Sequence, residues 1–220
     1  MNPRHTYIPL KWKNVDNVRS IVLDWANILY NEKRHEFEPD QTDFYLDKNL
    51  NKISSKDDIV ITKWSIGNFD TAFHCITGWG LYDIYPWWRE MQTFFEKDVG
   101  LKSWLPFPCL LLSKSNLRRH WDKGRPTAFN YSIFGEEIIT NCIWHTRGVT
   151  VDTPPDETYS YNKENSILVD TSYDHGGYNN PGHDYSELRA IFNMGFDEEY
   201  DICLKKILES QKLGLFDKLK

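Results

Sequence analysis

Residues 128–144 read AFNYSIFGEEIITNCIW, and this stretch decides the fold. It holds two runs rich in β-favouring residues, with a short segment that begins at Gly135 between them. Three further runs of the same character lie at 109–112, 166–170 and 190–196. Short apolar runs bounded by turn residues are typical of an antiparallel β domain, so we expect residues 100–196 to be built mainly of strands.

Helical patterns flank these strands. Apolar residues recur at helical spacing over 17–31, and 87–99 looks helical, with Pro86 suited to its first turn. A short strand is expected at 59–61, and the polar stretch 34–58 is expected to be a loop or small excursion. Residues 197–211 predict a last helix, with Asp197 as its N-cap.

The order of helices, then strands, then a helix predicts a mainly β protein with flanking helices, a β-sandwich or jelly roll with helices packed on one sheet. No linker divides the chain, so we expect a single domain over 1–220. Within it, 1–99 would be a helical or mixed elaboration packed on a 100–196 core, and 197–220 would form the C-terminal helix.

Composition excludes several classes of protein. A formal net charge of −6 argues against a broad nucleic-acid-binding surface. The four cysteines contain no C-x-x-C pair, and no apolar run approaches the length that spans a bilayer. No secretory signal is visible at the N-terminus. These features predict a cytoplasmic protein without a membrane partner, and they leave the oligomeric state open.

A His-x-Asp pair at His120 and Asp122 is the first candidate for chemistry. In a strand, residues i and i+2 point to the same face, so a nitrogen and a carboxylate oxygen can reach one point. Two histidines and one carboxylate form a metal-binding face that suits Fe(II) and leaves coordination positions open. In a chain of this composition one such pair is close to what chance gives, so the alternative is a solvated strand end.

The second half of the candidate site is His175 with Arg189, fourteen residues later. His175 follows an expected strand and a tight turn, and Arg189 opens the next strand. A guanidinium offers a planar fork that matches a carboxylate. Arg189 beside an open metal site would bind a dicarboxylate, and the alternative is a surface ion pair with Glu187 or a nearby Asp.

The order of these motifs resembles the Fe(II)/2-oxoglutarate-dependent oxygenase family, in its prolyl-hydroxylase-like or aspartyl/asparaginyl-hydroxylase-like branch. His120-Trp121-Asp122-Lys123-Gly124-Arg125 resembles the family's H-x-D-x-x-R, and 128–133 resembles the strand that follows it. His175 with Asn179 resembles its H-x-V-x-N element, except that Gly177 stands in place of Val. The resemblance covers roughly residues 100–196.

The resemblance implies a double-stranded β-helix, a cupin-like jelly roll, with Fe(II) held by His120, Asp122 and His175. It implies 2-oxoglutarate as co-substrate bound by Arg189, O₂ as oxidant, and hydroxylation of a small molecule or of an amino-acid or peptide side chain, with release of succinate and CO₂. Arg147 is a less favoured candidate than Arg189 for the arginine that binds the co-substrate.

Other polar residues have candidate roles beside this centre. Asn130 and Tyr131 lie on opposite faces of one strand, and we favour Tyr131 as the co-substrate contact over its alternative role in core packing. Asn179 would hold the His175 loop or touch a ligand. Arg125 would pair with Asp122 or bind substrate, and His145 would lie near the mouth of the barrel.

Phosphate-binding loops, a dinucleotide fingerprint, a G-x-S-x-G elbow and H-E-x-x-H are all absent from the sequence. Two alternatives to the oxygenase remain: a non-catalytic cupin-like binding protein, and a metalloenzyme on the same scaffold that does not use 2-oxoglutarate. The aromatic segment 79–88 and Trp104 would form either a cleft wall or the core. The sequence does not identify the substrate.

Overall fold

A computed structural model describes residues 3–28, 43–46, 59–65, 72–78, 80–105, 108–113, 119–148, 153–161, 165–183 and 187–220. The helices in this part of the chain are α1 (Val15–Asn27), α2 (Gly80–Ile84), α3 (Pro86–Thr93), the π-helical turn η3 (Phe94–Val99), α4 (Tyr200–Lys212) and the 3-10 helix η4 (Leu215–Leu219). The strands are β1 (His5–Pro9), β2 (Asp43–Leu46), β3 (Ile59–Ser65), β4 (Ala72–Thr77), β5 (Cys109–Ser113), β6 (Thr127–Phe134), β7 (Ile139–Trp144), β8 (Glu157–Tyr159), β9 (Asn165–Asp170), β10 (Asp174–Asn179) and β11 (Arg189–Phe196).

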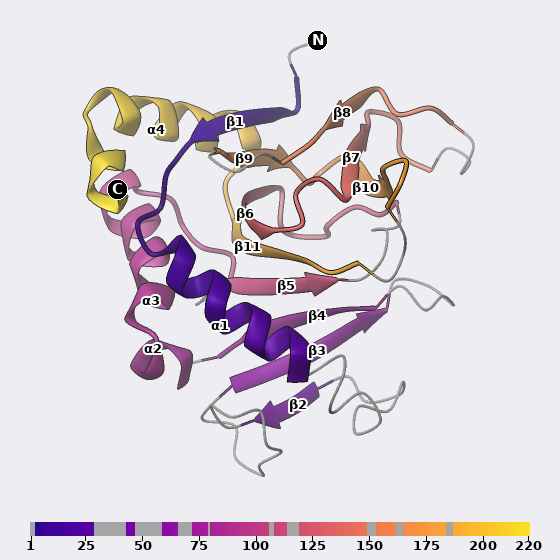
Figure 1. Ribbon diagram of the computed structural model, residues 1–220. Coiled ribbons are helices and arrows are strands. Elements are labelled where there is room, and N and C mark those ends of the chain that lie inside the picture. The colour runs from indigo at the N-terminus through magenta and orange to yellow at the C-terminus, as the bar shows by residue number, and fades with distance from the viewer. Residues whose placement is uncertain are drawn as a thin grey trace.

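The larger sheet runs through the middle of the molecule (Figure 1). In the described chain it has eight strands in the order β1-β9-β6-β11-β5-β4-β3-β2, and every neighbouring pair is antiparallel. Four of these strands, β1 to β4, come from the first 99 residues. The N-terminal part of the chain therefore widens the sheet at both edges.

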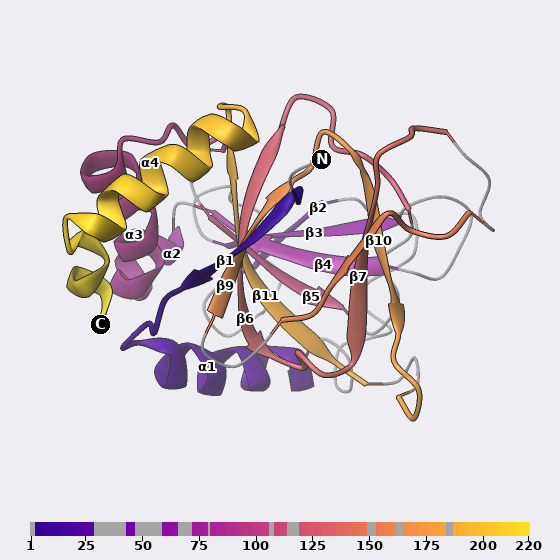
Figure 2. The same cartoon turned by 90° about the horizontal axis from the view of Figure 1, so that it is seen from above.

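A smaller antiparallel sheet contains three described strands in the order β10-β7-β8. Viewed from above, β7 and β10 lie to one side of β6, β9 and β11 (Figure 2). Side chains from the two sheets pack together in a small apolar cluster that includes Ile143, Tyr159, Ile167 and Ile191. This cluster joins the sheets face to face, as in a sandwich.

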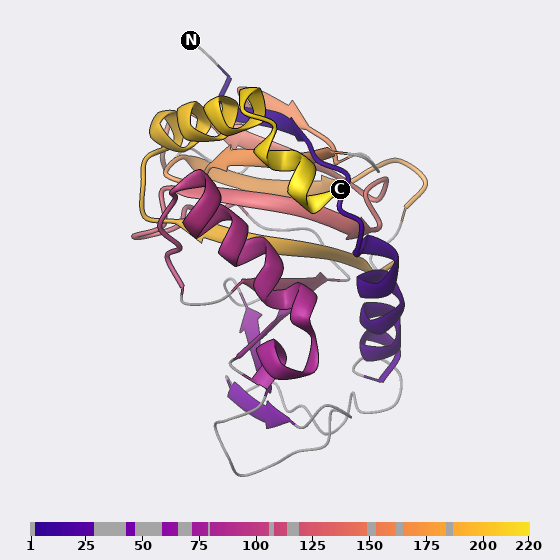
Figure 3. The same ribbon diagram turned by 90° about the vertical axis from the view of Figure 1, so that its left-hand side faces the viewer.

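The helices cover the other face of the larger sheet. Figure 3 shows α1, α3 and α4 on that side. The main core lies between them and the sheet, and it buries large rings such as Trp12, Trp88 and Phe192 completely. Burial of aromatic surface on this scale is the dominant favourable contribution to folding.

Alternation along β6 separates the two faces. Phe129, Tyr131 and Ile133 join the helix-side core, whereas Ala128 and Asn130 face the space between the sheets. Successive strand side chains point to opposite faces, so one strand supplies both the core and the cavity. The expected strands of the 100–196 region are confirmed, as are the helix that begins at Pro86 and a helix over most of 17–31, although α1 begins two residues earlier, at Val15.

The start of the last helix differs from expectation. Asp197 is not its N-cap: α4 begins at Tyr200, after an extended Glu199. The backbone N–H of Asp197 donates to the carbonyl of Lys102 at 3.1 Å, and its carboxylate pairs with the Lys102 ammonium at 2.6 Å. These contacts hold the chain extended beyond β11 and delay the helix. Of the stretch 34–58, only 43–46 lies within the described residues.

Across the described ranges, no helix is both long and apolar enough to cross a membrane.

Candidate metal centre

His120 and His175 are held side by side by their backbones. Each donates its N–H to the carbonyl of the other, at 2.8 Å from His120 and 2.6 Å from His175. The two imidazole rings lie with their centroids 4.3 Å apart. His175 sits at the start of β10, and its strand pairing with β7 fixes its orientation.

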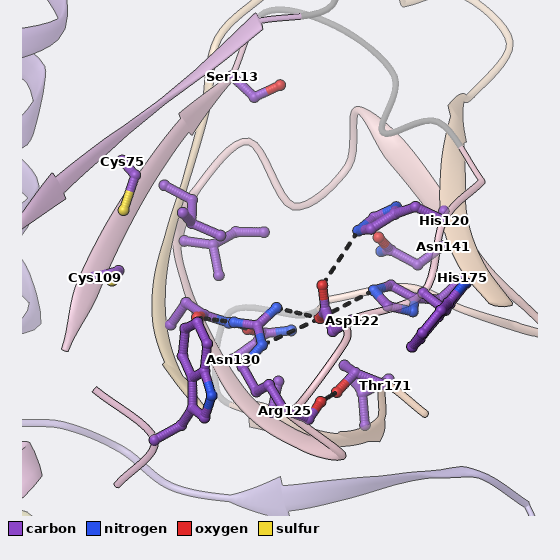
Figure 4. A pocket seen from close by; sticks show the side chains of 18 of the residues that line it. Cys75, Cys109, Ser113, His120, Asp122, Arg125, Asn130, Asn141, Thr171 and His175 are labelled. Carbon is purple, nitrogen blue, oxygen red and sulfur yellow. Dashed lines mark hydrogen bonds and ion pairs between the residues drawn. The ribbon is translucent and has the colours of Figure 1, made fainter. Parts of the chain in front are cut away.

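Asp122 completes the group. Its backbone N–H donates to the carbonyl of Thr171 at 3.1 Å, which fixes the segment that follows His120. Its carboxylate oxygens lie 3.8 Å from His120 Nε2 and 3.5 Å from His175 Nε2. One ligand atom from each of these three residues lies within 4.8 Å of the others, a spacing that suits a shared metal ion (Figure 4).

The hydrogen bond of His175 assigns its tautomer. Its Nδ1 lies 3.0 Å from the carbonyl oxygen of Tyr173, which can only accept. Nδ1 therefore carries the proton, and in the neutral ring Nε2 has a free lone pair directed toward Asp122. A backbone carbonyl that fixes the second nitrogen in this way is typical of histidine metal ligands.

Arg125 donates two hydrogen bonds to one oxygen of Asp122. Its Nε donates to Asp122 Oδ2 at 3.1 Å and its Nη2 donates to the same oxygen, while Nη1 donates to Asn193 Oδ1 at 2.7 Å. Asn193 in turn donates to Asn130 Oδ1 at 2.5 Å. This chain of hydrogen bonds leaves Asp122 Oδ1 without a hydrogen bond from Arg125, and that oxygen faces His120.

The residues around Asp122 determine its charge. Burial acts to raise the pKa of Asp122, but the interactions of its carboxylate with the His175 side chain and with the Arg125 guanidinium outweigh burial and hold this pKa below its usual range. The side chain is therefore a carboxylate at neutral pH. Two imidazole nitrogens and one carboxylate oxygen form a donor set that suits a divalent transition metal.

The three residues open into a cavity of about 360 Å³ between the two sheets. Its lining includes Asn130, Asn141 and Arg189 in addition to the metal-binding group. A volume near the low end of the range for ligand pockets, ~300–1,000 Å³, suits one or two small molecules.

Arg189 is the one buried cation that lines this cavity among the described residues. Its side chain is only 7% exposed, and its Nε has no hydrogen-bond partner in the described part of the chain. Burial lowers the pKa of Arg189, although the nearby Tyr161 and Tyr159 act to raise it. A guanidinium stays charged in proteins, so an unpaired one in a cavity is costly unless an anion binds there.

Tyr131 is not where we expected it. Its ring lies in the helix-side core, and its hydroxyl accepts a hydrogen bond from the backbone N–H of Trp12 at 3.3 Å. Strand alternation puts Asn130 on the cavity side instead, so the interpretation of Tyr131 as a co-substrate contact is wrong.

Three other candidates lie outside the cavity lining. His145 Nε2 pairs with Glu157 Oε1 at 2.6 Å, and the Arg147 guanidinium donates to the carbonyl of Ser172, at 3.1 Å from Nε. Asn179 ends β10, at the opposite end from His175, and its buried amide has no partner among the described residues. None of these side chains lines the cavity that His175 faces.

The sequence reasoning missed Asn193 and Tyr161, which both line the cavity. For Asn193 a signal existed, because it lies four residues after Arg189 in the same strand and therefore faces the same way. No local signal marked Tyr161, which lies beyond the end of β8.

Neither a scan of protein-family models nor a search of curated proteins by sequence finds a match. Comparison with solved structures does find similar folds. AviO1 from Streptomyces viridochromogenes Tue57 is 8% identical with a TM-score of 0.50, over 88% of this chain and 89% of AviO1. EvdMO1 is 12% identical with a TM-score of 0.51, over 88% of this chain and 47% of EvdMO1. The chain shares its fold with these two proteins.

This chain therefore spans about half the length of EvdMO1. HygX from Streptomyces hygroscopicus, whose structure has nickel and 2-oxoglutarate bound, is also a structural neighbour. It is 10% identical with a TM-score of 0.48, over 88% of this chain and 82% of HygX.

Proposed function

We propose that this protein is an Fe(II)- and 2-oxoglutarate-dependent oxygenase, a hydroxylase of a small molecule or an amino-acid side chain. One observation carries the proposal: a two-histidine, one-carboxylate group lines the same cavity as Arg189, which is buried and has no ion pair among the described residues. The order of these residues in the sequence, which resembles that of the 2-oxoglutarate oxygenase family, supports the same function.

The strand arrangement supports a double-stranded β-helix as the scaffold. β5, β11, β6 and β9 lie together in the larger sheet, and β10, β7 and β8 form the smaller one. The His120–His175 bridge extends the smaller sheet by one short pairing. Two facing antiparallel sheets that each contribute four neighbouring chain segments are the arrangement of a jelly roll, with 1–99 as an elaboration and 197–220 as the C-terminal helical segment.

His120, Asp122 and His175 would hold the iron, because imidazole nitrogen and carboxylate oxygen suit Fe(II) and three ligands leave positions open. Arg189 would pair with the distal carboxylate of 2-oxoglutarate through its planar fork. When bound, iron and 2-oxoglutarate supply the oxidising chemistry: one oxygen atom of O₂ enters a substrate C–H bond, and the other enters succinate as CO₂ leaves.

The chain's own side chains would orient these reactants. Arg125 fixes one oxygen of Asp122 and leaves the other toward His120, so the carboxylate keeps a single orientation. The Tyr173 carbonyl keeps His175 in the tautomer that offers Nε2. The apolar walls around Ile191 and Val169 limit water near the reacting atoms.

The buried guanidinium supports this function over a metalloenzyme that does not use 2-oxoglutarate. Such an enzyme gives no reason for a charged Arg189 that has no ion pair among the described residues, whereas a cupin-like binding protein would differ from the oxygenase in forming no succinate. A dicarboxylate that reaches from the metal to Arg189 does give such a reason.

The test is anaerobic titration of Fe(II) with 2-oxoglutarate. We expect a weak visible charge-transfer band in the wild type, no band in His175→Ala, and a band in Arg189→Ala only at much higher 2-oxoglutarate. Lys205→Ala, on an exposed part of α4, should behave as the wild type. A band that persists undiminished in His175→Ala, or no band in the wild type, contradicts the proposal.

We place the protein in the cytoplasm as part of this proposal. All four cysteines are buried free thiols, a state that a reducing compartment maintains.

A further inference from the structure

Three of the described residues that line the cavity mark its open side. Among the described residues that line the cavity, only Trp104, Trp121 and Lys123 are exposed, and the rest are buried or half-buried. Two indole rings and one ammonium group therefore meet any molecule that enters. The lining that contains these residues continues to His120 and His175.

The two indoles at the entrance stand apart from the protein's other tryptophans. Trp104 is 38% exposed and Trp121 is 43% exposed. Every other tryptophan whose side chain the structure describes is buried, with at most 9% of its surface exposed. Large exposed apolar rings are unfavourable in water, so two of them at the mouth of one cavity indicate a binding surface.

A guanidinium lies near the face of each ring. The Arg147 guanidinium lies 4.6 Å from the ring centroid of Trp121, and its Nε bonds the carbonyl of Ser172 at 3.1 Å. The Arg125 guanidinium lies 6.0 Å from the ring centroid of Trp104. Rings that are fixed before a ligand arrives lose little conformational entropy on binding.

The charge of the lining is positive, although the whole chain has a formal net charge of −6. Its cations are Lys123, Arg125 and Arg189, and Asp122 is its sole carboxylate among the described residues. Arg125 is already paired with Asp122. Lys123 and Arg189 have no ion pair within the described chain, so one unpaired cation lies deep in the cavity and one lies at its entrance.

We infer that the substrate is a small organic acid with a flat apolar ring, which stacks on Trp104 or Trp121 and directs its carboxylate or phosphate toward Lys123. This inference rests on the proposed function, in which 2-oxoglutarate takes Arg189. A cavity of about 360 Å³ shared with 2-oxoglutarate leaves room for one ring rather than a fused polycyclic skeleton.

Trp121 also places such a ligand near the metal. It lies between His120 and Asp122 in the sequence, and Gly124, beside which the Trp104 indole nitrogen lies, belongs to the turn that follows. A ring bound at the entrance therefore contacts the same short segment that supplies two of the metal ligands. The carbon nearest the metal would be the one that is oxidised.

Ligand-observed NMR with three matched probes tests the inference. The full chain is loaded with Zn(II) and saturating 2-oxoglutarate, which keeps the metal and Arg189 occupied. Phenylacetate should bind more tightly than 2-phenylethanol, and phenethylamine should bind most weakly. Acetate, which has the acid but no ring, should show no binding. Phenyl phosphate, which has the ring and a phosphate, compares phosphate with carboxylate at the same site.

Substitutions locate the site. Trp121→Ala or Trp104→Ala should weaken phenylacetate binding about five- to tenfold. Lys123→Ala should weaken phenylacetate about two- to fivefold and leave 2-phenylethanol unchanged. Leu213→Ala, which removes an exposed apolar side chain at the end of α4, and Lys205→Ala are the matched controls and should change neither probe.

A second arm separates this inference from the proposed function. Phenylacetate binding is repeated on metal-free Arg189→Ala, where neither the metal nor Arg189 can hold the probe. Retained binding that still depends on Trp121 supports the entrance site even if 2-oxoglutarate does not bind. Phenethylamine binding as tightly as phenylacetate, or phenylacetate binding that is unchanged in both tryptophan variants, overturns the inference.

Discussion

Asp122 offers its two oxygens to different partners. One oxygen accepts from both Nε and Nη2 of Arg125, and the other faces His120. A carboxylate held in this way enters metal binding already charged and oriented. Arg125 therefore acts on the metal through Asp122, and its contribution can be measured as metal affinity.

Arg125→Ala should weaken metal binding about 10- to 100-fold, since loss of a group that orients a metal ligand typically has this effect. Arg125→Lys should have a metal affinity between those of the wild type and Arg125→Ala, because a single ammonium group cannot reproduce the planar pair of donors of a guanidinium. Isothermal titration with Co(II) measures the affinity. Arg19→Ala, which removes an arginine paired with Asp16 on α1, is the control, and equal affinities in Arg125→Ala and wild type would contradict the role.

Gly195 makes room for that arginine. A Cβ at position 195 would overlap the Cγ and Cδ atoms of Arg125. Gly195→Ala should therefore displace Arg125 from Asp122 and weaken Co(II) binding nearly as much as Arg125→Ala does. In the double variant the two losses should not add, because both act through one contact. Fully additive losses would mean that Gly195 acts elsewhere.

At this scale the sequence predicted which residues meet, but not every direction in which they point. His120, Asp122, His175 and Arg189 are brought together as their order suggested. The choice between Asn130 and Tyr131 failed because β6 is covered on both faces, by helices on one side and by the smaller sheet on the other. A strand buried on both faces has no polar side to reveal its orientation.

The pairing of β7 with β10 explains a departure from the family pattern. Gly177 stands where that pattern has Val, and a Cβ there would lie 2.8 Å from Ile139 Cγ2 and 3.2 Å from the carbonyl of Thr140. Ile139 already fills the space that a Val at 177 would take. Gly177 is paired in register with Asn141, and its missing side chain leaves room for Ile139, the diagonal neighbour on β7.

Gly177→Val should lower the free energy of unfolding by about 1–3 kcal/mol, as overpacking of a filled site does. Gly177→Val combined with Ile139→Ala should recover part of that loss, because the second change restores space. Urea unfolding measures both. A Val variant as stable as the wild type would show that β7 and β10 pack differently.

The same strand shows why elements differ in how well sequence predicts them. β6, β7, β9 and β11 are runs of apolar and β-branched residues, and their periodicity marks them. The sequence of β10 is DHGGYN, with glycine at two positions, and Tyr178 is the one residue in it that favours a strand. It is a strand because β7 lies beside it, which is a tertiary cause that local patterns do not contain.

Across the whole molecule, Glu157 joins the two sheets at one edge. Its two oxygens accept from the backbone N–H of Arg4, at 3.0 and 2.9 Å, and they also pair with His5 Nδ1 at 2.9 Å and His145 Nε2 at 2.6 Å. Arg4 and His5 belong to the N-terminal edge of the larger sheet, and Glu157 begins β8 in the smaller one. This carboxylate therefore links an edge of the larger sheet to an edge of the smaller one.

Burial acts to raise the pKa of Glu157, but its hydrogen bonds with Arg4, His145 and His5 outweigh burial and lower this pKa below its ordinary value of 4.5. A lowered pKa in the folded state means that the stabilisation is present above about pH 4.5 and is lost as the pH falls below it. The difference in melting temperature between wild type and Glu157→Gln should therefore be largest near pH 7 and should shrink toward pH 3.

Glu209→Gln, at an exposed position on α4, serves as the control and should leave the melting temperature unchanged at every pH. A difference for Glu157→Gln that stays constant with pH would show that the amide loses packing rather than charge.

The backbone pairing of His120 with His175 makes it possible to remove a metal ligand in a living cell without removing the folded protein. Their mutual N–H to carbonyl bonds involve no side-chain atom, so exchange of either imidazole leaves the local chain path supported. A strain that makes His175→Ala would carry a protein of native shape that lacks a metal ligand. A phenotype that the His175→Ala strain shares with a deletion strain comes from loss of the metal-dependent activity. A phenotype that appears in the deletion strain but not in the His175→Ala strain comes from loss of the folded protein itself.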